Sequence, residues 1–290
     1  MKEITILSGK GGTGKTSITA ALASVAKNTV FCDNDVDASD LHLILKPEIL
    51  ERNTFHSGWK ATINNQKCTA CDLCTDYCRF DAIRKTKTGS LYIDPFKCEG
   101  CRLCERICPE KAISSLRNDN NVWYVSSTRF GHLVHARMAP GEENSGKLVT
   151  AIRKRARVIA SETGADFILN DGPPGIGCPT ISSLTGTNFV LLVIEPSRSA
   201  LHDAARLTEL VSSFSISSGA VINKYTINET LALETEKYLR INNIPLLARI
   251  PFDKSIVEAM IQGKSIIEFN PGSGIAGSIE KLWKKLISLN

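Results

Sequence analysis

Short apolar runs recur along the chain with the composition of buried β-strands, and helical segments alternate with them. Runs of this kind between turn signals are typical of strands that are buried on both faces. The alternation predicts an α/β fold with a mostly parallel sheet that is covered by helices on both faces. The runs are Ile4–Leu7, Val30–Cys32, Val122–Val125, Phe167–Asn170, Phe189–Ile194, Ala220–Lys224 and Ile244–Ile250, and the helical segments include Ser17–Lys27, Leu148–Thr163 and Gly277–Leu289.

Two stretches depart from this alternation. Between residues 60 and 116 cysteines become dense, and we expect residues 60–116 to form an inserted α+β domain. The host domain then consists of residues 1–59 and 117–290, and the ends of the insert should lie close together. Arg129–Val149 is polar and contains Pro140-Gly141, which predicts a loop. The basic run Arg153–Arg157 that follows it is expected to form a solvated helix face.

Eight cysteines of the insert form an internal repeat with a period of 30 residues, counted from Cys68 to Cys98. The repeat extends past the cysteines, since Phe80–Ile83 parallels Glu110–Ile113. Each half has the spacing C-x2-C-x2-C-x3-C, in which three thiolates on a tight loop can bind three irons of one cubane. A zinc site would instead show C-x-x-C pairs at longer spacing. The spacing therefore favours two [4Fe-4S] clusters.

In this spacing the insert resembles the bacterial two-cluster ferredoxins, in which the fourth cysteine of each half binds the other cluster. We also expect that fourth cysteine to open a short helix. By this resemblance the first cluster takes Cys68, Cys71, Cys74 and Cys108, and the second takes Cys98, Cys101, Cys104 and Cys78. Arg79 stands where the motif usually has proline, a change that removes no ligand.

The stretch Leu7–Ser17 lies between the first predicted strand and the first predicted helix. It fits the pattern G-x-x-x-x-G-K-[ST], whose glycines let backbone N–H groups point at phosphate oxygens. We expect Lys15 to bind the outer phosphates and the Thr16 hydroxyl to bind Mg²⁺. The other nucleotide-binding candidates are Gly9, Gly11, Gly12, Thr13, Gly14 and Ser17.

Carboxylates follow two of the predicted strands. Asp171 opens the segment D-G-P-P-G, in which a carboxylate holds Mg²⁺ through water and Gly175 can sense the γ-phosphate. A second group, Asp33, Asp35, Asp37 and Asp40, follows Val30–Cys32. Because the carboxyl ends of parallel strands meet at one edge of the sheet, we expect these side chains to face the nucleotide. The motifs predict a site for Mg²⁺ and a nucleoside triphosphate.

With these motifs the chain resembles the deviant-P-loop ATPases, which include MinD, ParA and the nitrogenase iron protein. Lys10–Thr16 matches their K-G-G-x-G-K-[ST] pattern, and Asp171–Gly175 matches their D-x-P-P-G pattern. The resemblance implies that ATP is the nucleotide and that Lys10 acts in trans across an ATP-dependent homodimer. It places Asp33 and Asp35 in switch I, with Asp35 positioning the attacking water and Asp33 acting on Mg²⁺ or its waters. It also implies that Asn223 contacts adenine.

The resemblance extends to one cysteine outside the insert. Cys178 falls where the nitrogenase iron protein has one of its cluster cysteines, and Asn144 occupies the place of the other. One thiolate from each of two subunits gives too few ligands for an ordinary cubane. Cys178 is therefore either an interface metal ligand in switch II or a semi-buried cysteine, and the sequence leaves both open.

Composition narrows the partners and the compartment. The formal net charge is +5, so a nucleic-acid partner is not expected. Met1 leads directly into a strand, which predicts no signal peptide, and no apolar run reaches the roughly 20 residues of a membrane span. MinD has an amphipathic membrane-binding helix at its C-terminus, but Gly277–Leu289 is expected to cover the sheet, so membrane attachment is not expected. We expect a cytoplasmic protein whose clustered cysteines bind metal.

Three functions fit these features. The first is an ATPase that couples ATP-driven dimer switching to electron transfer through two [4Fe-4S] clusters, with an unidentified redox protein as partner. The second is an assembly or carrier ATPase that delivers an iron–sulfur cluster or metallocofactor to an acceptor protein. The third is a positioning switch whose clusters only sense redox state.

Overall fold

The structure is a computed structural model that describes residues 1–56, 58–119, 121–138 and 145–289. The chain separates into two compact units. The first unit comprises residues 1–52, 123–137 and 145–290, and the second comprises residues 53–122 and 138–144. These divisions fall several residues outside the expected insert of residues 60–116.

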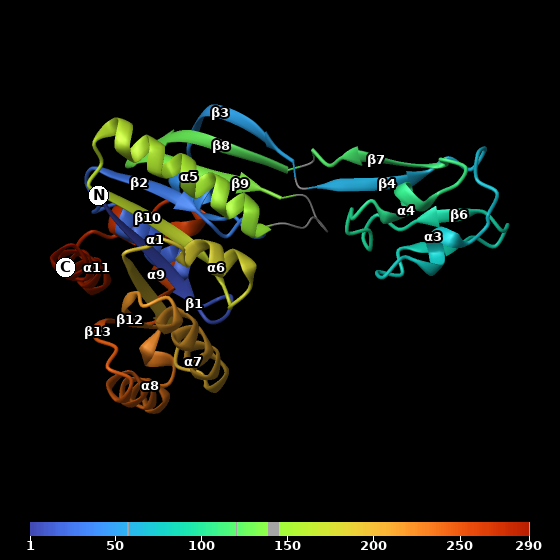
Figure 1. Ribbon diagram of the computed structural model, residues 1–290. Helices are drawn as coiled ribbons and strands as arrows, with labels where there is room; N and C mark the ends of the chain where they lie inside the picture. The colour runs from blue at the N-terminus through green and yellow to red at the C-terminus, as the bar shows by residue number, and fades with distance from the viewer. Residues whose placement is uncertain (57, 120, 139–144, 290) are drawn as a thin grey trace. The chain divides into compact units, whose positions relative to one another are not determined.

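The first unit is built on a sheet whose strands run in the order β13-β12-β11-β1-β10-β2-β9-β8-β3 (Figure 1). Neighbouring strands from β13 through β9 are parallel, so the predicted α/β fold with a mostly parallel sheet is confirmed. The strands are β1 (Lys2–Ser8), β2 (Thr29–Asp33), β3 (Glu48–Phe55), β8 (Asn121–Thr128), β9 (Gly131–Arg137), β10 (Phe167–Pro174), β11 (Phe189–Ile194), β12 (Ser217–Asn223) and β13 (Leu246–Ile250).

Helices cover both faces of this sheet (Figure 1). Alternate strand residues enter two different cores, since Leu191 and Val193 pack on one face while Val190 and Leu192 pack on the other. The first core includes residues of α1 (Lys15–Ala23), α2 (Leu41–Leu45), α9 (Lys254–Ile261), α10 (Ile266–Phe269) and α11 (Gly274–Ser288). The opposite side carries α5 (Ser145–Thr163), α6 (Cys178–Leu184), α7 (Arg198–Ser213) and α8 (Glu229–Ile241), and a short 3-10 turn, η1 (Tyr225–Ile227), follows β12.

Two expectations for the middle of the chain are wrong. The expected loop Arg129–Val149 contains β9, which pairs with β2 and buries Leu133 and Val134. The expected solvated basic face is not fully solvated, because Arg153 is only 3% exposed and donates to Glu3 Oε1 at 2.9 Å. Glu3 lies in β1 and is equally buried, so the pair satisfies two charges that would otherwise be costly in the interior.

The final helix covers the sheet, as expected for Gly277–Leu289. Ile279, Leu282, Trp283 and Leu286 of α11 are buried in the core beneath the sheet, whereas Ile287 is 44% exposed. None of the helices in the described ranges is both long and apolar enough to cross a membrane.

The second unit is made of two small antiparallel ribbons and two short helices. One ribbon pairs β4 (Trp59–Ile63) with β7 (Ile113–Arg117), and the other pairs β5 (Ile83–Lys85) with β6 (Leu91–Ile93). Because Trp59 lies opposite Arg117, the two ends of the unit lie side by side. The helices are α3 (Leu73–Asp76) and α4 (Leu103–Ile107).

The expectation that Cys78 and Cys108 open helices is wrong. The helices α3 and α4 surround the third cysteine of each half and end before the fourth. Each helix begins after a left-handed residue, Asp72 at φ 61° and Arg102 at φ 61°, which turns the chain sharply between the second and third cysteines. The turn that the motif needs is thus made earlier than we expected.

Candidate functional site

The Gly-rich loop between β1 and α1 takes a conformation that only glycine tolerates well. Gly12 and Gly14 have φ values of 79° and 88°, in the left-handed region. A Cβ on Gly14 would also lie 2.3 Å from Asn223 Nδ2, and a Cβ on Gly9 would lie 2.5 Å from the backbone carbon of Asp203. The loop is therefore shaped both by its own turn and by close packing against β12 and α7.

Lys15, Thr16 and Asp171 form one buried cluster at the start of α1. Lys15 Nζ lies 3.1 Å from Asp171 Oδ1, and the Thr16 hydroxyl donates to Asp171 Oδ2 at 2.7 Å. Thr19 adds a third donor to the same carboxylate at 2.9 Å. Burial alone would lower the pKa of Lys15, but Asp171 and then Asp35 outweigh it and raise that pKa above its ordinary value. The lysine is thus held as a cation at the predicted phosphate site.

The switch I carboxylates differ from each other in this cluster. Asp33 is fully buried and accepts hydrogen bonds from the Ser39 hydroxyl at 2.8 Å and the Leu41 N–H at 3.2 Å. Burial and the neighbouring Asp171 raise the pKa of Asp33 to about 8. Asp35 is half-buried, lies 3.4 Å from Lys15 Nζ, and has its pKa raised to about 6, chiefly by burial. Asp35 is therefore the more accessible of the two.

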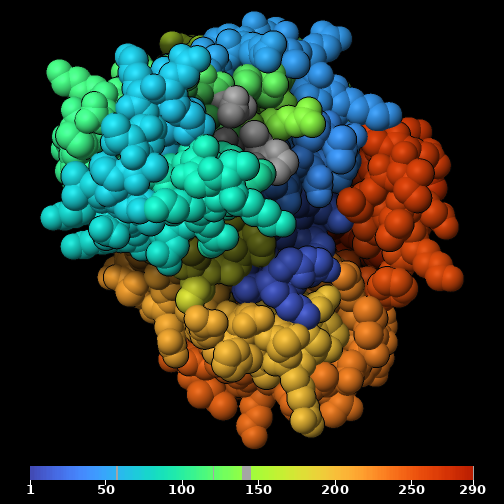
Figure 2. All heavy atoms as spheres, turned by 90° about the vertical axis from the view of Figure 1, so that its right-hand side faces the viewer, coloured from blue at the N-terminus to red at the C-terminus, as the bar shows by residue number. Residues whose placement is uncertain are grey.

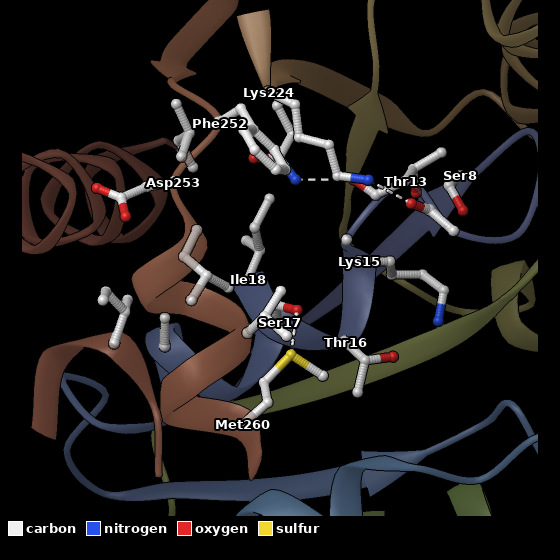
Figure 3. A pocket seen from close by; sticks show the side chains of 18 of the residues that line it. Ser8, Thr13, Lys15, Thr16, Ser17, Ile18, Lys224, Phe252, Asp253 and Met260 are labelled. Atoms are coloured by element: carbon white, nitrogen blue, oxygen red, sulfur yellow. Dashed lines mark hydrogen bonds between the residues drawn. The ribbon is translucent and has the colours of Figure 1, made fainter. Parts of the chain in front are cut away.

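A cavity of about 400 Å³ opens beside the loop, between α1 and the segment from β13 to α9 (Figure 3). Its inner wall is polar and carries Lys15, Thr16 and Asp35. Its outer wall is mostly apolar and contains Ile250, Pro251, Phe252, Ile256, Val257, Met260, Ile266, Ile275 and Ile279. A polar end next to an apolar slot fits a ligand with a charged chain and a flat ring.

Asn223 is 3% exposed and lines this cavity. Its Nδ2 donates to the Thr13 carbonyl at 2.8 Å, which fixes the orientation of the amide. Its Oδ1 is buried and has no hydrogen-bond partner among the described residues. An unpaired buried acceptor suits a ligand amino group, such as the one that adenine carries where guanine carries a carbonyl.

Lys10 lies outside this cluster and contacts residues around the start of α7. Its Nζ is 2.7 Å from Glu195 Oε1 and donates to the hydroxyls of Ser197 and Ser199 at 3.2 Å and 3.1 Å. In the space-filling view the dark-blue loop reaches the surface beside the gold residues around the start of α7 (Figure 2). Lys224 also lies 3.4 Å from Glu195 and donates to the Gly12 carbonyl at 2.7 Å.

Glu195 and Lys224 were not among the predicted site residues. Glu195 directly follows β11, and Lys224 directly follows β12. The rule that parallel strands bring their carboxyl ends to one edge could have found both, had we applied it to every strand and not only to those followed by several aspartates.

Gly175 and Cys178 lie after β10. Gly175 has a φ of 81°, and its N–H donates to the Ser8 carbonyl at 2.9 Å, beside the Gly-rich loop. Cys178 is exposed at the first residue of α6. Asn144, the position compared with the second nitrogenase-type cysteine, lies outside the described residues.

The cysteines of the second unit line two separate cavities in two groups. One cavity is lined by Cys68, Cys71, Cys74 and Cys108, and the other by Cys78, Cys98, Cys101 and Cys104, with Cys74 also at its wall. Each group contains three cysteines of one half and the fourth cysteine of the other. Backbone N–H groups of Ala70 and Ala112 donate to the sulfurs of Cys68 and Cys108 at 3.4 Å and 3.3 Å.

These thiols fit the donor set of iron–sulfur clusters, which are bound by four cysteines and tuned by N–H donors to sulfur. Among the described residues of the two walls there is no histidine, and the carboxylates are Glu99 and Glu110. Within the described ranges, no three His, Cys, Asp or Glu side chains are grouped so that they could hold a single metal ion.

A sequence profile of the CobQ/CobB/MinD/ParA nucleotide binding domain matches residues 4–266. The chain belongs to this family. An uncharacterized protein of Methanocaldococcus jannaschii is 32% identical over 290 residues, which cover 98% of this chain and 96% of that protein. In this chain the Gly-rich loop and Asn223 line one cavity, and Asp171 bonds to Lys15 and Thr16 of its wall.

Two further likenesses concern the fold and a short segment. The structure of MinD from Pyrococcus horikoshii complexed with Mg-ADP has a TM-score of 0.60 and 21% identity, and the match covers 99% of this chain and 96% of that one. Pyruvate synthase subunit PorD of M. jannaschii is 33% identical over 61 residues, which cover 21% of this chain and 71% of the subunit. The CobQ/CobB/MinD/ParA fold thus accounts for the first unit.

Proposed function

We propose that this protein is an ATP-hydrolysing iron–sulfur protein that couples ATP-driven dimer switching to electron transfer through two [4Fe-4S] clusters. One observation carries the proposal. Eight cysteines of the second unit line two cavities in two groups of four, with Cys74 at both walls, in a chain whose other unit is a MinD-like nucleotide-binding domain. In the proposed domain assignment, residues 60–116 form the ferredoxin-like insert and residues 1–59 with 117–290 form the ATPase.

In the ATPase part, Lys15 and the loop N–H groups bind the phosphates of ATP, and Thr16 and Asp171 hold Mg²⁺, Asp171 through water. The contacts in the structure support these roles, because Lys15 and Thr16 both bond to Asp171. The three groups that would bind phosphate and Mg²⁺ therefore lie together. Asp35 positions the attacking water. Its half-buried position and raised pKa, about 6, suit a group that accepts a hydrogen bond from water.

Asn223 selects adenine through its unpaired Oδ1, and Gly175 reports the γ-phosphate to the segment that leads into α6. Lys10 leaves Glu195 and stabilises phosphoryl charge in the partner subunit of the ATP-bound homodimer. Asp33 acts on Mg²⁺ or its waters only after it loses the proton that its raised pKa favours.

In the insert, Cys68, Cys71, Cys74 and Cys108 hold the first cluster, and Cys98, Cys101, Cys104 and Cys78 hold the second. When bound, such clusters supply one-electron transfer. Leu91 and Ile113 belong to the small core of this unit and line the first cavity, so they would shield the first cluster from water. The short match to a pyruvate synthase subunit adds support to a role in redox metabolism.

A cluster carrier or assembly ATPase is the second candidate. It is favoured by the exposure of Cys178 at the start of α6, two residues after Ile176 and three after Gly175. In that case the two subunits of a dimer would hold a labile metal or cluster between two copies of Cys178, and an apo-protein would receive it.

The test is anaerobic purification of the full chain, with iron and sulfide analysis and electron paramagnetic resonance of the reduced protein with and without Mg-ATP. We expect about eight irons per chain, the same content in Cys178→Ala, and a spectrum or midpoint potential that changes on ATP binding. Iron that falls in Cys178→Ala and passes to an apo-ferredoxin supports the carrier function. An iron-free protein that still hydrolyses ATP rules out both.

A further inference from the structure

The two halves of the cysteine repeat have the same backbone but different charges. Left-handed residues recur at the same three positions of each half, with φ values of 53° and 64°, 61° and 61°, and 48° and 48°. The pairs are Ala70 and Gly100, Asp72 and Arg102, and Asp81 and Lys111. The chain turns in the same way at these positions of both halves. Charged residues at equivalent positions of the two halves can therefore be compared directly.

At three equivalent positions the first half has an acid and the second half has a base. The pairs are Asp72 and Arg102, Asp76 and Arg106, and Asp81 and Lys111. From Cys68 to Cys78 there are two acidic residues and no basic ones, a formal charge of −2. From Cys98 to Cys108 there are two acidic and two basic residues, a formal charge of zero.

The cavity walls repeat this difference. The only charged side chain among the described residues at the first cavity wall is Glu110, whereas the second cavity has Glu99 and Arg102. Arg102 is held in place, because its guanidinium carbon lies 4.2 Å from the centre of the Trp59 ring and its Nε donates to Glu105 at 2.8 Å. Its counterpart Asp72 pairs with Lys85 and is not part of the first cavity wall.

The loop that carries Arg102 is also fixed to the adjoining strand. A Cβ on Gly100 would lie 2.2 Å from the Trp59 carbonyl oxygen, so the second-half loop packs directly on β4. The Trp59 ring has a second cation near it, since the Arg117 guanidinium carbon is 5.8 Å from the ring centre. Arg102 is therefore a fixed charge and not a freely moving surface side chain.

We propose that the two clusters have unequal reduction potentials, that the cluster of Cys98, Cys101, Cys104 and Cys78 has the higher one, and that Arg102 is the main tuning residue. The inference rests on the proposed iron–sulfur function. Reduction adds one negative charge to a cluster, so a fixed cation stabilises the reduced form and an anion destabilises it. One electron from a low-potential one-electron donor then comes to rest on the second cluster, whichever cluster it enters first.

The test is a potentiometric titration of the full chain, followed by electron paramagnetic resonance, on protein that first passes the iron analysis. We expect two one-electron waves. Arg102→Gln should lower only the higher wave, by a tenfold change in the ratio of reduced to oxidised cluster, or about 59 mV for a one-electron couple. Asp72→Asn should raise only the lower wave, by a smaller amount because Asp72 does not line the first cavity, whereas Arg102 lines the second.

Lys87→Gln is the matched control, because it removes one positive charge from an exposed turn of the same unit. It should move either wave by less than a third as much as Arg102→Gln. A single wave in the unsubstituted chain, equal shifts in Arg102→Gln and Lys87→Gln, or a shift of the lower wave in Arg102→Gln would each overturn the proposal. Low iron content would instead count against the iron–sulfur function itself, and the two failures are therefore distinct.

Discussion

The nucleotide site and the cysteine unit are built in different ways. In the first unit, Lys15, Thr16 and Asp171 are already bonded to one another above two extensive apolar cores. In the second unit the apolar cluster formed by described residues is small and contains Ala61, Cys74, Ile83, Leu91 and Ile113, and most of the remaining cysteines pack against it. The nucleotide site is positioned by the large apolar cores of its unit. The cysteines, by contrast, make up a large part of the packing of the second unit.

This difference indicates which unit needs its ligand in order to fold. A small unit with so few buried side chains gains little from apolar burial, and comparable domains use disulfides or metals to become stable. The cysteines in this unit are free thiols among the described residues. We therefore expect the proposed clusters to stabilise the second unit, and the nucleotide only to change the conformation of the first.

Removal of iron gives the largest expected effect. Chelation under reducing conditions should unfold the second unit and leave the first unit folded, because metal binding there supplies folding free energy. Limited proteolysis should then cut within residues 60–116, while the first unit keeps a cooperative thermal transition and binds nucleotide. Protection of the second unit in iron-free protein would show that its small core is sufficient and would break the comparison.

Lys15→Ala tests the nucleotide site of the first unit. The change removes the cation that pairs with Asp171 and the group that is expected to bind the outer phosphates, so ATP hydrolysis should fall by roughly 100-fold or more. Iron content should stay the same, since the cysteines do not depend on this site. Lys27→Ala, at an exposed lysine just after α1, is the matched control and should keep full activity.

Acid should lower the unfolding free energy of the first unit through His135. This side chain is 7% exposed, stacks on His42 and Tyr124, and bonds to Ser126 at 3.1 Å. Burial, with a smaller contribution from His42, lowers the pKa of His135 to about 4. A depressed histidine pKa gives stability that is present above the unfolded value of about 6.5 and is lost as pH falls toward 4.

Between pH 7 and pH 5 the first unit should therefore lose about 2 kcal/mol of unfolding free energy through this group. Denaturant unfolding of the first unit at the two pH values measures it. His135→Asn should remove most of the pH dependence, although it lowers stability at pH 7, whereas His132→Asn on the same strand should not. Equal pH slopes in all three proteins would contradict the assignment to His135.

The parts of the site that were predicted from the sequence are those formed by contiguous residues. The loop Leu7–Ser17 and the segment Asp171–Gly175 each contain their chemistry in a few neighbouring positions, and strand ends placed them at one edge. The cysteine spacing predicted two clusters in the same way, whereas the assignment of the fourth cysteine of each half came from the resemblance to two-cluster ferredoxins. Asn223 was found only through the family resemblance, since one asparagine at a strand end has no pattern of its own.

The parts that were wrong or missed depend on distant residues. Arg153 is buried because Glu3, 150 positions away, lies opposite it, and nothing near Arg153 announces that. The strand β9 was predicted as loop because the stretch is polar and contains Pro140-Gly141, yet His135 finds ring partners and a hydroxyl inside the fold. Burial of polar groups was decided by tertiary partners, which local periodicity does not contain.

Glu195→Gln has the smallest expected effect. It tests whether Lys10 is held away from the partner's nucleotide site in a single chain. The carboxylate now holds Lys10 and Lys224 together, and Lys224 reaches the Gly12 carbonyl. If Lys10 acts in the partner's site, as proposed, leaving Glu195 costs part of the free energy of dimerisation. The pair is partly exposed, so we expect its loss to strengthen ATP-dependent dimerisation by up to about 1 kcal/mol, or roughly fivefold.

Sedimentation equilibrium with a slowly hydrolysed ATP analogue measures this change, with Glu209→Gln on the exposed side of α7 as the control for charge. Lys10→Ala should lose the strengthened dimer, alone or combined with Glu195→Gln, because the lysine and not the carboxylate makes the contact in trans. Weaker dimerisation in Glu195→Gln would mean that the carboxylate orients Lys10 for its partner. The nucleotide site would then be prepared by its own chain in the same way as Lys15 and Thr16 already are.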